Sequence, residues 1–340
     1  MNAHIFRRVA GVLSIALLSG CGSGSFAAAQ PSNAGSTSVP SLALPSLQRV
    51  LAAAARTSPG APLRQAPVKA NSWMYTAQLY GNDSSVYERN GNALSWYENL
   101  YTGLSSPQGT MTTPNGWWYV ANGGHSNVVY YKTTKSGPNG PRGSLDDYGQ
   151  VPVNVSLTPD RRLVAVSNGQ TTSGGPGSVS IYLNRGAEPS RTLTYGGDQL
   201  LGEGVALDAR GNCYWSFNDS TTSSGTIVEF AGCVGSGTPV VSSIAYAGGI
   251  LFDQRGNLYY LDQESGLYYC KKGVTQCSLF ANGFGDPVNL NFDHRQKGLW
   301  VADADGYIWL VDPKSRQKTQ YQAEGGPTDP PFGIAPAPGG

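Results

Sequence analysis

Four polar residues stand at the expected starts of strands, each beside apolar residues: Gln108, Asn154, Glu203 and Asn289. Where several carboxylate and amide oxygens converge, they can hold a divalent cation such as Ca²⁺ or a small polar ligand. His125 adds a side chain that can exchange a proton near neutral pH. These five are candidate ligand-binding residues, although the polar side chains could instead only solvate strand ends.

The elements that must position these residues repeat every 40 to 50 residues. Six residues mark the turns of the repeat and are called the turn anchors below: Pro114, Pro159, Ala209, Gln254, His294 and Pro338. We call the strand before each anchor the inner strand. In most repeats this strand has bulky residues at alternate positions, which is typical of a strand with one packed face. Aromatic or β-branched strands follow five of the anchors. Six repeats predict an all-β, six-bladed β-propeller over residues 71–340.

The last repeat ends after its inner strand, so its other strands must come from elsewhere. Three strand-like stretches without an inner strand stand at the start of the repeat region, at 73–80, 85–89 and 94–98. We therefore expect ring closure by a C-terminal inner strand that pairs with N-terminal outer strands. Closure of this kind covers the open edges of both partners.

The loops after the second strands are expected to share one mouth of the propeller with the starts of the inner strands. These loops bring further polar residues: Asn122, Asn168, Asp219, Glu264 and Asp305. Asn or Asp at the end of a strand commonly accepts backbone hydrogen bonds in an Asx turn, so a structural role competes with ligand binding. The pair Trp117-Trp118 could stack on sugars, but alternation turns one of the two rings toward a neighbouring blade.

The repeat resembles that of NHL-repeat propellers. Their pattern of an apolar inner strand, an Asp, a turn and an aromatic strand ending in Ala-Asp is matched by Gly204-Val205-Ala206-Leu207-Asp208 and by Leu299-Trp300-Val301-Ala302-Asp303. The resemblance covers roughly residues 73–340. It implies the fold and says little about chemistry, because propellers host many unrelated functions.

A second resemblance concerns one segment. Gly202-Glu203-Gly204 is similar to the place where gluconolactonase-like (SMP-30-like) propellers hold a metal-binding carboxylate. The resemblance implies that Asn154 and Asn289 could act as amide ligands and that an Asp at the mouth would act as base, for which Asp305 is a poor positional match. It gives the alternative function, a metal-dependent lactonase-like hydrolase or lyase.

Four cysteines test the strand assignment. Cys270 and Cys277 flank a short turn, so they would lie opposite each other in a hairpin. Cys213 begins a second strand and Cys233 is expected to end the third. Two cross-strand disulfides are predicted, as suits an exported protein. A zinc site is the weaker alternative, because the sequence has no Cys-x-x-Cys pair and its three His are scattered.

The N-terminus indicates export. A cationic start and an apolar run at 9–18, too short to span a bilayer, are typical of a signal peptide. Leu18-Ser19-Gly20-Cys21 resembles the lipobox of bacterial lipoproteins, which implies a lipid on Cys21 and, with Gly22 rather than Asp next, the outer membrane. We expect a signal peptide at 1–20 and a Ser-, Gly-, Ala- and Pro-rich tether at 21–70.

Composition and missing motifs exclude several classes of function. The net charge is +1 and only 13% of residues are charged, so the chain has no electrostatic footprint for nucleic acid. Its sequence contains no Gly-rich phosphate loop, His-Glu-x-x-His or Gly-x-Ser-x-Gly. We therefore expect a membrane-anchored binding or scaffolding platform for a protein, peptide or glycan. No cofactor is implied beyond a possible Ca²⁺.

Overall fold

The computed structural model describes residues 73–90, 93–134, 137–197, 200–222, 224–272, 276–323 and 325–337. The predicted signal peptide at 1–20, Cys21 and the tether at 21–70 lie outside the described residues. In the described part of the chain, no helix is long and apolar enough to cross a membrane.

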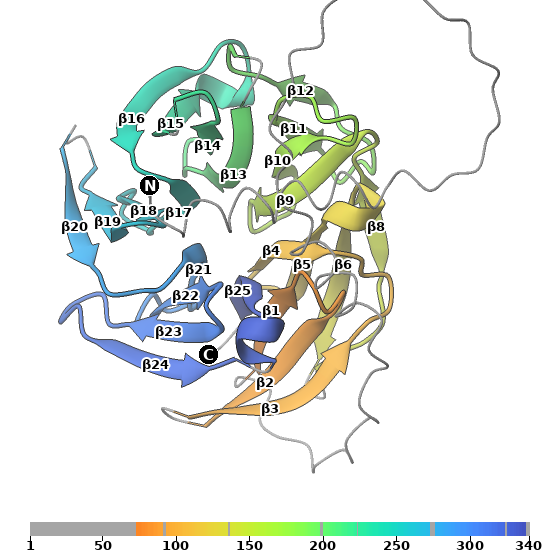
Figure 1. Cartoon of the computed structure of the whole chain (residues 1–340). Helices are drawn as coiled ribbons and strands as arrows, with labels where there is room; N and C mark the ends of the chain where they lie inside the picture. Colours follow the sequence, from red (N-terminus) through yellow and green to blue (C-terminus); the bar gives the residue numbers. More distant parts are fainter. Residues whose placement is uncertain are drawn as a thin grey trace, which may run out of the picture. The chain divides into compact units, whose positions relative to one another are not determined.

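The described residues form six four-stranded antiparallel sheets, one of which has an additional strand, arranged around an axis as a β-propeller (Figure 1). Blade 1 contains β4 (Pro107–Thr112), β5 (Trp117–Asn122), β6 (Asn127–Thr134) and β7 (Gly137–Pro138), with β8 (Gly143–Asp146) paired to β6. Blade 2 contains β9 (Gln150–Leu157), β10 (Leu163–Thr171), β11 (Ser178–Leu183) and β12 (Arg191–Leu193). Blade 3 contains β13 (Leu200–Leu207), β14 (Cys213–Asp219), β15 (Ser224–Phe230) and β16 (Thr238–Ile244).

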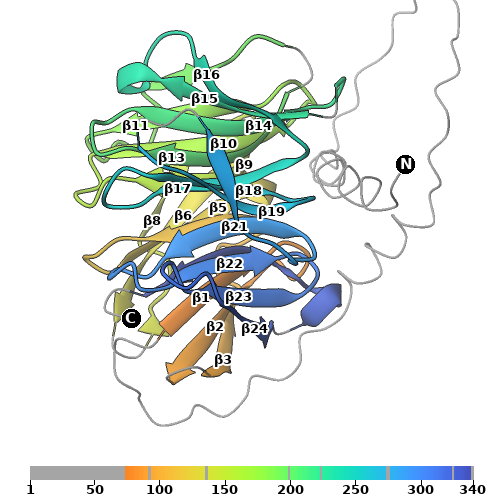
Figure 2. The ribbon, with the colours of Figure 1, turned by 90° about the vertical axis from the view of Figure 1, so that its left-hand side faces the viewer.

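The remaining blades complete the ring. Blade 4 contains β17 (Ala247–Phe252), β18 (Leu258–Asp262), β19 (Gly266–Cys270) and β20 (Cys277–Ala281). Blade 5 contains β21 (Pro287–Phe292), β22 (Leu299–Asp303), β23 (Tyr307–Val311) and β24 (Lys318–Gln322). Short 3-10 turns lie at η1 (Gly123–His125), η2 (Ala231–Cys233) and η3 (Gly326–Thr328). Figure 2 shows the ring from the side.

The closing blade joins the two ends of the repeat region, as predicted. Its strand order is β25-β1-β2-β3, with β25 (Pro331–Pro336) innermost and β1 (Trp73–Gln78), β2 (Ser84–Asn90) and β3 (Ala93–Leu100) outside it. β1 pairs antiparallel with β25, with Tyr75 opposite Ala335 and Thr76 opposite Ile334. The predicted all-β, six-bladed fold and its mode of closure are therefore confirmed.

Hydrophobic layers between neighbouring blades form the core. The described residues contain six such clusters, one for each blade interface around the ring. The aromatic second strands supply their largest members: Trp118, Trp215 and Trp300 are fully buried. Trp118 belongs to the layer shared with the closing blade, whereas Trp117 packs against the layer shared with blade 2. Alternation along one strand thus fastens a blade to both of its neighbours.

The turns at the first five anchors are closed by the side chain of the residue just before the anchor. Asp208 in blade 3 accepts backbone N–H bonds from Arg210 at 2.8 Å and from Asn212 at 2.9 Å. In blade 2, Thr158 takes this position, and its hydroxyl accepts a bond from the Leu163 N–H at 3.2 Å. Short polar side chains that bind the backbone nearby favour turns for this reason.

The inner strands approach so closely that some positions exclude a side chain. A Cβ on Gly109 of β4 would lie 2.7 Å from the Val153 carbonyl oxygen and 2.8 Å from the Asn154 Cα on the neighbouring inner strand. A Cβ on Gly333 of β25 would overlap the Gln108 carbonyl oxygen. Glycine is required here because the backbones of adjacent blades meet.

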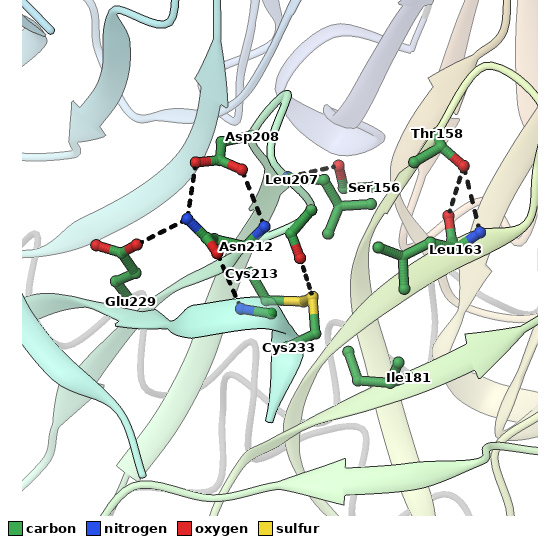
Figure 3. The surroundings of a disulfide bond; sticks show 12 residues. Ser156, Thr158, Leu163, Ile181, Leu207, Asp208, Asn212, Cys213, Glu229 and Cys233 are labelled. Atoms are coloured by element: carbon green, nitrogen blue, oxygen red, sulfur yellow. Dashed lines mark hydrogen bonds between the residues drawn. A yellow bond between two sulfur atoms is a disulfide. The ribbon is translucent and has the colours of Figure 1, made fainter. Parts of the chain in front are cut away.

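Both predicted disulfides are present. Cys270 and Cys277 lie directly opposite each other, with Cα atoms 4.2 Å apart. The Cys213–Cys233 pairing is also correct, with Cα atoms 4.9 Å apart (Figure 3). Its predicted cross-strand position is wrong, however, because Cys213 stands opposite Phe230, the last residue of β15, and Cys233 follows in η2. The extra turn carries the chain back far enough for the two sulfur atoms to meet.

Candidate functional site

A channel of about 240 Å³ runs along the propeller axis. The inner strands of blades 1 to 5 line it, together with turn residues that include Pro114, Pro159 and His294. Its walls combine aliphatic and aromatic side chains with polar ones, and the polar lining includes Asn154, Asn289, Asn291, Gln254, Gln296 and His294. Apolar walls with converging polar groups are typical of a small-ligand site.

Asn154 and Asn289 reach this channel from opposite blades. In the ring order β25, β4, β9, β13, β17 and β21, strands β9 and β21 stand three places apart, so blades 2 and 5 face each other across the axis (Figure 1). Both side chains are more than nine-tenths buried. The Asn154 amide forms no hydrogen bond with any described residue, although it lines the channel. Its donors and its acceptor remain available to a ligand.

The two asparagines occupy one position of the repeat, five residues before the turn anchor. The same position holds glycine elsewhere in the ring: Gly109, Gly204, Gly249 and Gly333. At those glycines the next inner strand leaves little or no room for a Cβ. Blades 2 and 5 therefore place polar side chains where the other blades pack backbone against backbone.

Hydrogen bonds to the closing blade orient the blade 5 side of the channel. The Asn289 Oδ1 accepts the Ile334 N–H at 3.1 Å. The Asn291 Nδ2 donates to the carbonyl oxygens of Ile334, at 2.9 Å, and of Thr110, at 2.8 Å. Asn291 thus spans from β21 across β25 to β4. The Asn289 amide nitrogen forms no hydrogen bond with a described residue, so it is left to donate.

His294 stands where the channel meets the anchor turns. Its Nε2 lies 3.4 Å from the Thr112 Oγ1, and that hydroxyl donates its proton to the Pro336 carbonyl oxygen at 2.5 Å. The Thr112 oxygen can therefore only accept from the imidazole, which places the proton on Nε2 and leaves Nδ1 as an acceptor. Burial lowers the pKa of His294, and the nearby Asp293 carboxylate opposes that shift.

Gln108 and Glu203 do not line the channel, unlike Asn154 and Asn289. They stand six residues before their anchors and the asparagines stand five before theirs, so strand alternation points the two pairs differently. Glu203 accepts a bond from Asn218 at 3.2 Å. Neither Asn154 nor Glu203 stands at a strand start as expected, because β9 begins at Gln150 and β13 at Leu200.

The Asn and Asp residues that end the second strands hold backbone in place. The Asn122 Oδ1 accepts the Ser105 N–H at 2.6 Å, just before β4. Asn218 exchanges two bonds with the backbone of Ala247 at the start of β17, at 2.8 and 3.0 Å. Asp303 accepts the Gly285 N–H at 2.8 Å, just before β21. These side chains fasten the entry to the inner strands, in agreement with the structural alternative.

The other loop candidates are more open to solvent. His125 is exposed in η1, and its Nδ1 lies 3.5 Å from the Asn122 Nδ2. Asp219 accepts bonds from the Thr221 N–H and hydroxyl at 2.8 and 2.6 Å. Glu264 is exposed and Asp305 is half-buried. Among the residues that the structure describes, no group of three or more His, Cys, Asp or Glu could hold a metal ion.

Sequence reasoning missed His294 as a site residue, since its place in the turn alone suggested an anchor. The sequence prediction also places the polar residues at the opposite mouth, whereas the polar lining reaches the anchor turns. One signal in the sequence separates the two asparagines from Gln108 and Glu203: alignment of the repeats on their anchors shows four glycines and two asparagines in one column.

Comparison with known proteins supports the fold. No protein-family model matches this chain, and no curated protein matches it. Among solved structures, it is similar to a chain of hydrazine synthase from Kuenenia stuttgartiensis, with a TM-score of 0.57 and 10% identity. The match covers 84% of this chain and 94% of that one. At this identity the likeness shows a shared propeller fold and carries no activity with it.

Proposed function

We propose that this protein is a lipid-anchored binding platform of the bacterial cell envelope, whose propeller takes a small polar ligand or a polar end of a partner into its central channel. The anchor is Cys21, and the outer membrane is the expected location. The observation that carries the binding proposal is the pair of amides, Asn154 and Asn289, on opposite walls of the channel with hydrogen-bonding groups unspent.

The lining favours a neutral polar group over an ion. Buried donors and acceptors without partners cost stability, so an amide kept in a closed channel is compensated when a ligand binds it. Asp293 is the one acidic residue in the lining, and its Oδ1 already accepts N–H bonds from Arg295 and Lys297 at 3.1 and 2.9 Å. A hydroxyl- or amide-bearing group, such as a glycan end or a peptide side chain, matches this chemistry.

The repeat itself supplies the test variant. Asn154→Gly with Asn289→Gly places in blades 2 and 5 the residue that other blades use, and removes both amides. Thermal shift against monosaccharides, amino-acid amides and short peptides should give at least one stabilising ligand for the wild type and none for the double variant. Asn115→Gly, at an exposed turn position, is the matched control. A ligand that stabilises all three proteins equally would contradict binding at the channel.

Anchoring needs a separate test. Radioactive palmitate should label the wild-type protein in bacteria and leave Cys21→Ser unlabelled. Equal labelling of the two would overturn the anchor while leaving the channel proposal intact.

The lactonase-like alternative stays a prediction. It requires Glu203, Asn154 and Asn289 to share one ion, and the Asn289 oxygen already accepts the Ile334 N–H. Turnover of lactones by the purified protein, with Ca²⁺, Zn²⁺ or Mn²⁺ and with loss of activity in Glu203→Gln, would favour that alternative over a binding protein.

A further inference from the structure

The turn between β9 and β10 carries an arginine in a backbone conformation that favours glycine. Two residues after the anchor, Gly116, Gly211 and Gly256 have φ of 74°, 82° and 81°. Arg161 occupies the same place in blade 2 with φ of 60°. A left-handed conformation costs a non-glycine residue roughly 1–2 kcal/mol. Strain of this kind is often kept where the side chain has a function.

The Arg161 side chain lies flat against an aromatic group of blade 1. Its guanidinium carbon is 3.8 Å from the centre of the Trp117 ring, 5.7 Å from that of Tyr130 and 5.9 Å from that of Tyr119. Trp117 and Tyr130 meet edge to face at 5.8 Å. A guanidinium that stacks on a ring uses its face for that contact, so its N–H donors, which lie in its plane, do not take part in the stacking.

Those donors have no partner in the described structure. The Arg161 Nε is buried without a hydrogen bond, and the side chain forms no ion pair with a described residue. The carboxylate next to it in the chain is turned elsewhere: Asp160 accepts bonds from the Thr158 hydroxyl at 2.7 Å and from the Arg162 N–H at 3.1 Å. The Nη groups also form no hydrogen bond with a described residue, so an oxyanion from outside the chain that accepts their N–H bonds would be stabilised here.

Further positive charge surrounds the same aromatic group. The Lys132 Nζ lies 5.0 Å from the Trp117 ring centre. Arg185 donates from Nε and Nη2 to the Asp160 carbonyl oxygen at 3.3 and 3.1 Å, which holds its guanidinium beside this turn. Burial raises the pKa of Tyr119 to about 12, and the charges of Arg161 and Arg185 act against that rise. The local excess of cations contrasts with a chain whose net charge is only +1.

We propose that Arg161, with Arg185 beside it, is a binding site for an oxyanion, a carboxylate or phosphate group that presents two oxygens in one plane to the guanidinium. Planar bidentate pairing with such groups is the characteristic chemistry of arginine. Pro159, two residues before Arg161 in the same turn, lines the axial channel, whereas Arg161 contacts the aromatic rings of blade 1. The site is distinct from the channel amides and does not depend on what the channel holds.

The test is a titration of the purified full-length protein with sodium acetate and, separately, sodium phosphate, with sodium chloride balancing ionic strength. Isothermal titration calorimetry should give saturable binding with a dissociation constant on the order of 1 mM. Arg161→Gln should weaken binding about tenfold or more, and Arg161→Lys should weaken it less, because it keeps the charge and loses the planar fork. The stronger of the two probes identifies the group as carboxylate or phosphate.

Two variants serve as matched controls. Arg210→Gln removes an arginine from the corresponding turn of blade 3, where the guanidinium already pairs with Asp208 at 3.3 Å. Arg316→Gln changes an arginine of blade 5 that also has a positive φ, 62°, and whose guanidinium carbon lies 4.9 Å from the centre of the Phe280 ring. Both should bind as the wild type does.

A second readout separates binding from packing. In protein labelled with ¹⁵N-arginine, the Nε–H signal that disappears in Arg161→Gln should shift during titration of the wild type. No saturable binding, equal affinity in Arg161→Gln, or an unshifted Arg161 signal would overturn the proposal and leave Arg161 as a packing residue between blades 1 and 2.

Discussion

Blades 2 and 5 differ from blades 1, 3 and 4 at the same two positions of one repeat. Five residues before the anchor, blades 2 and 5 carry Asn154 and Asn289, and the other three carry glycine. Two residues after it, they carry Arg161 and Gln296, and the other three again carry glycine. The blades that differ lie opposite each other (Figure 1).

This difference distinguishes the glycines, which the propeller fold requires, from the polar side chains that replace them in blades 2 and 5. Glycine stands where adjacent inner strands touch or where the turn needs a positive φ, so it is the residue that the fold alone requires. Side chains at these positions cost packing or backbone strain. In this molecule they include the channel asparagines, whose amide groups keep unused donors, and Arg161, whose guanidinium forms no ion pair with a described residue.

Among the blades that carry glycine at both positions, blade 3 should lose the most stability when its disulfide is removed. The Cys233 sulfur lies 3.3 Å from the Gly211 carbonyl oxygen, so this disulfide holds the turn of blade 3 that corresponds to the turn of Arg161 in blade 2. Cys213→Ser with Cys233→Ser should lower the free energy of unfolding by about 3 kcal/mol, because the bond closes a loop of some 20 residues. Urea unfolding should show a smaller loss, about 2 kcal/mol, for the Cys270–Cys277 pair, whose separation is 7. Equal losses would argue against loop entropy as the cause.

The close contact of inner strands can be tested directly. Gly109→Ala places a Cβ 2.7 Å from the Val153 carbonyl oxygen and should cost about 2–3 kcal/mol by overpacking. Asn154 stands at the same repeat position in blade 2 and already has a Cβ, so Asn154→Ala adds no atom and should cost less than about 1 kcal/mol. Chemical denaturation measures the free energy of unfolding of the two variants. Similar losses would show that the two kinds of blade do not differ in packing at this repeat position.

A buried carboxylate makes blade 2 sensitive to pH. Burial raises the pKa of Asp147 to about 6, against hydrogen bonds such as that from the Ser180 hydroxyl at 2.7 Å. A raised pKa in the folded state favours the protonated form, so stability present below pH 4 is lost as pH rises through 6. Asp147→Asn should therefore be more stable than the wild type by about 2 kcal/mol at pH 8 and no more stable at pH 4.

Thermal unfolding across this pH range measures the effect. Burial also raises the pKa of Asp329 to about 6, so the variant should keep part of the decline. A difference between wild type and Asp147→Asn that stays constant from pH 4 to pH 8 would be incompatible with titration of Asp147.

The smallest effect concerns turn conformation alone. Gly211 has a φ of 82° with nothing within 4 Å of where a Cβ would stand. Gly211→Ala should cost about 1 kcal/mol through backbone strain, since it meets no steric contact. The measured loss of stability estimates the cost of the left-handed backbone conformation at Arg161 in blade 2. An alanine variant as stable as the wild type would remove strain as an indication of function at Arg161.

The fold could be predicted well because its signals are local and repeated. Bulky residues at alternate positions before the anchor and polar residues beside it recur in most of the repeats, so errors in one repeat are corrected by the others. The error at Cys233 arose where a 3-10 turn interrupts the ladder after Phe230, because such a turn leaves no trace in an alternating pattern. The candidate site was predicted only in part, since Asn154 and Asn289 line the channel while Glu203 does not.

By itself the sequence determined the strands, the number of blades, the ring closure and the cysteine pairs, because hydrophobic periodicity and turn chemistry act over a few residues. Only the tertiary structure decided which polar side chains keep unspent hydrogen-bonding groups. Asn218 and Asn154 are both buried asparagines on strands of the propeller, yet one binds the backbone of Ala247 and the other faces the channel. That outcome depends on which strands of other blades lie within hydrogen-bonding distance, and those contacts exist only once the ring has closed.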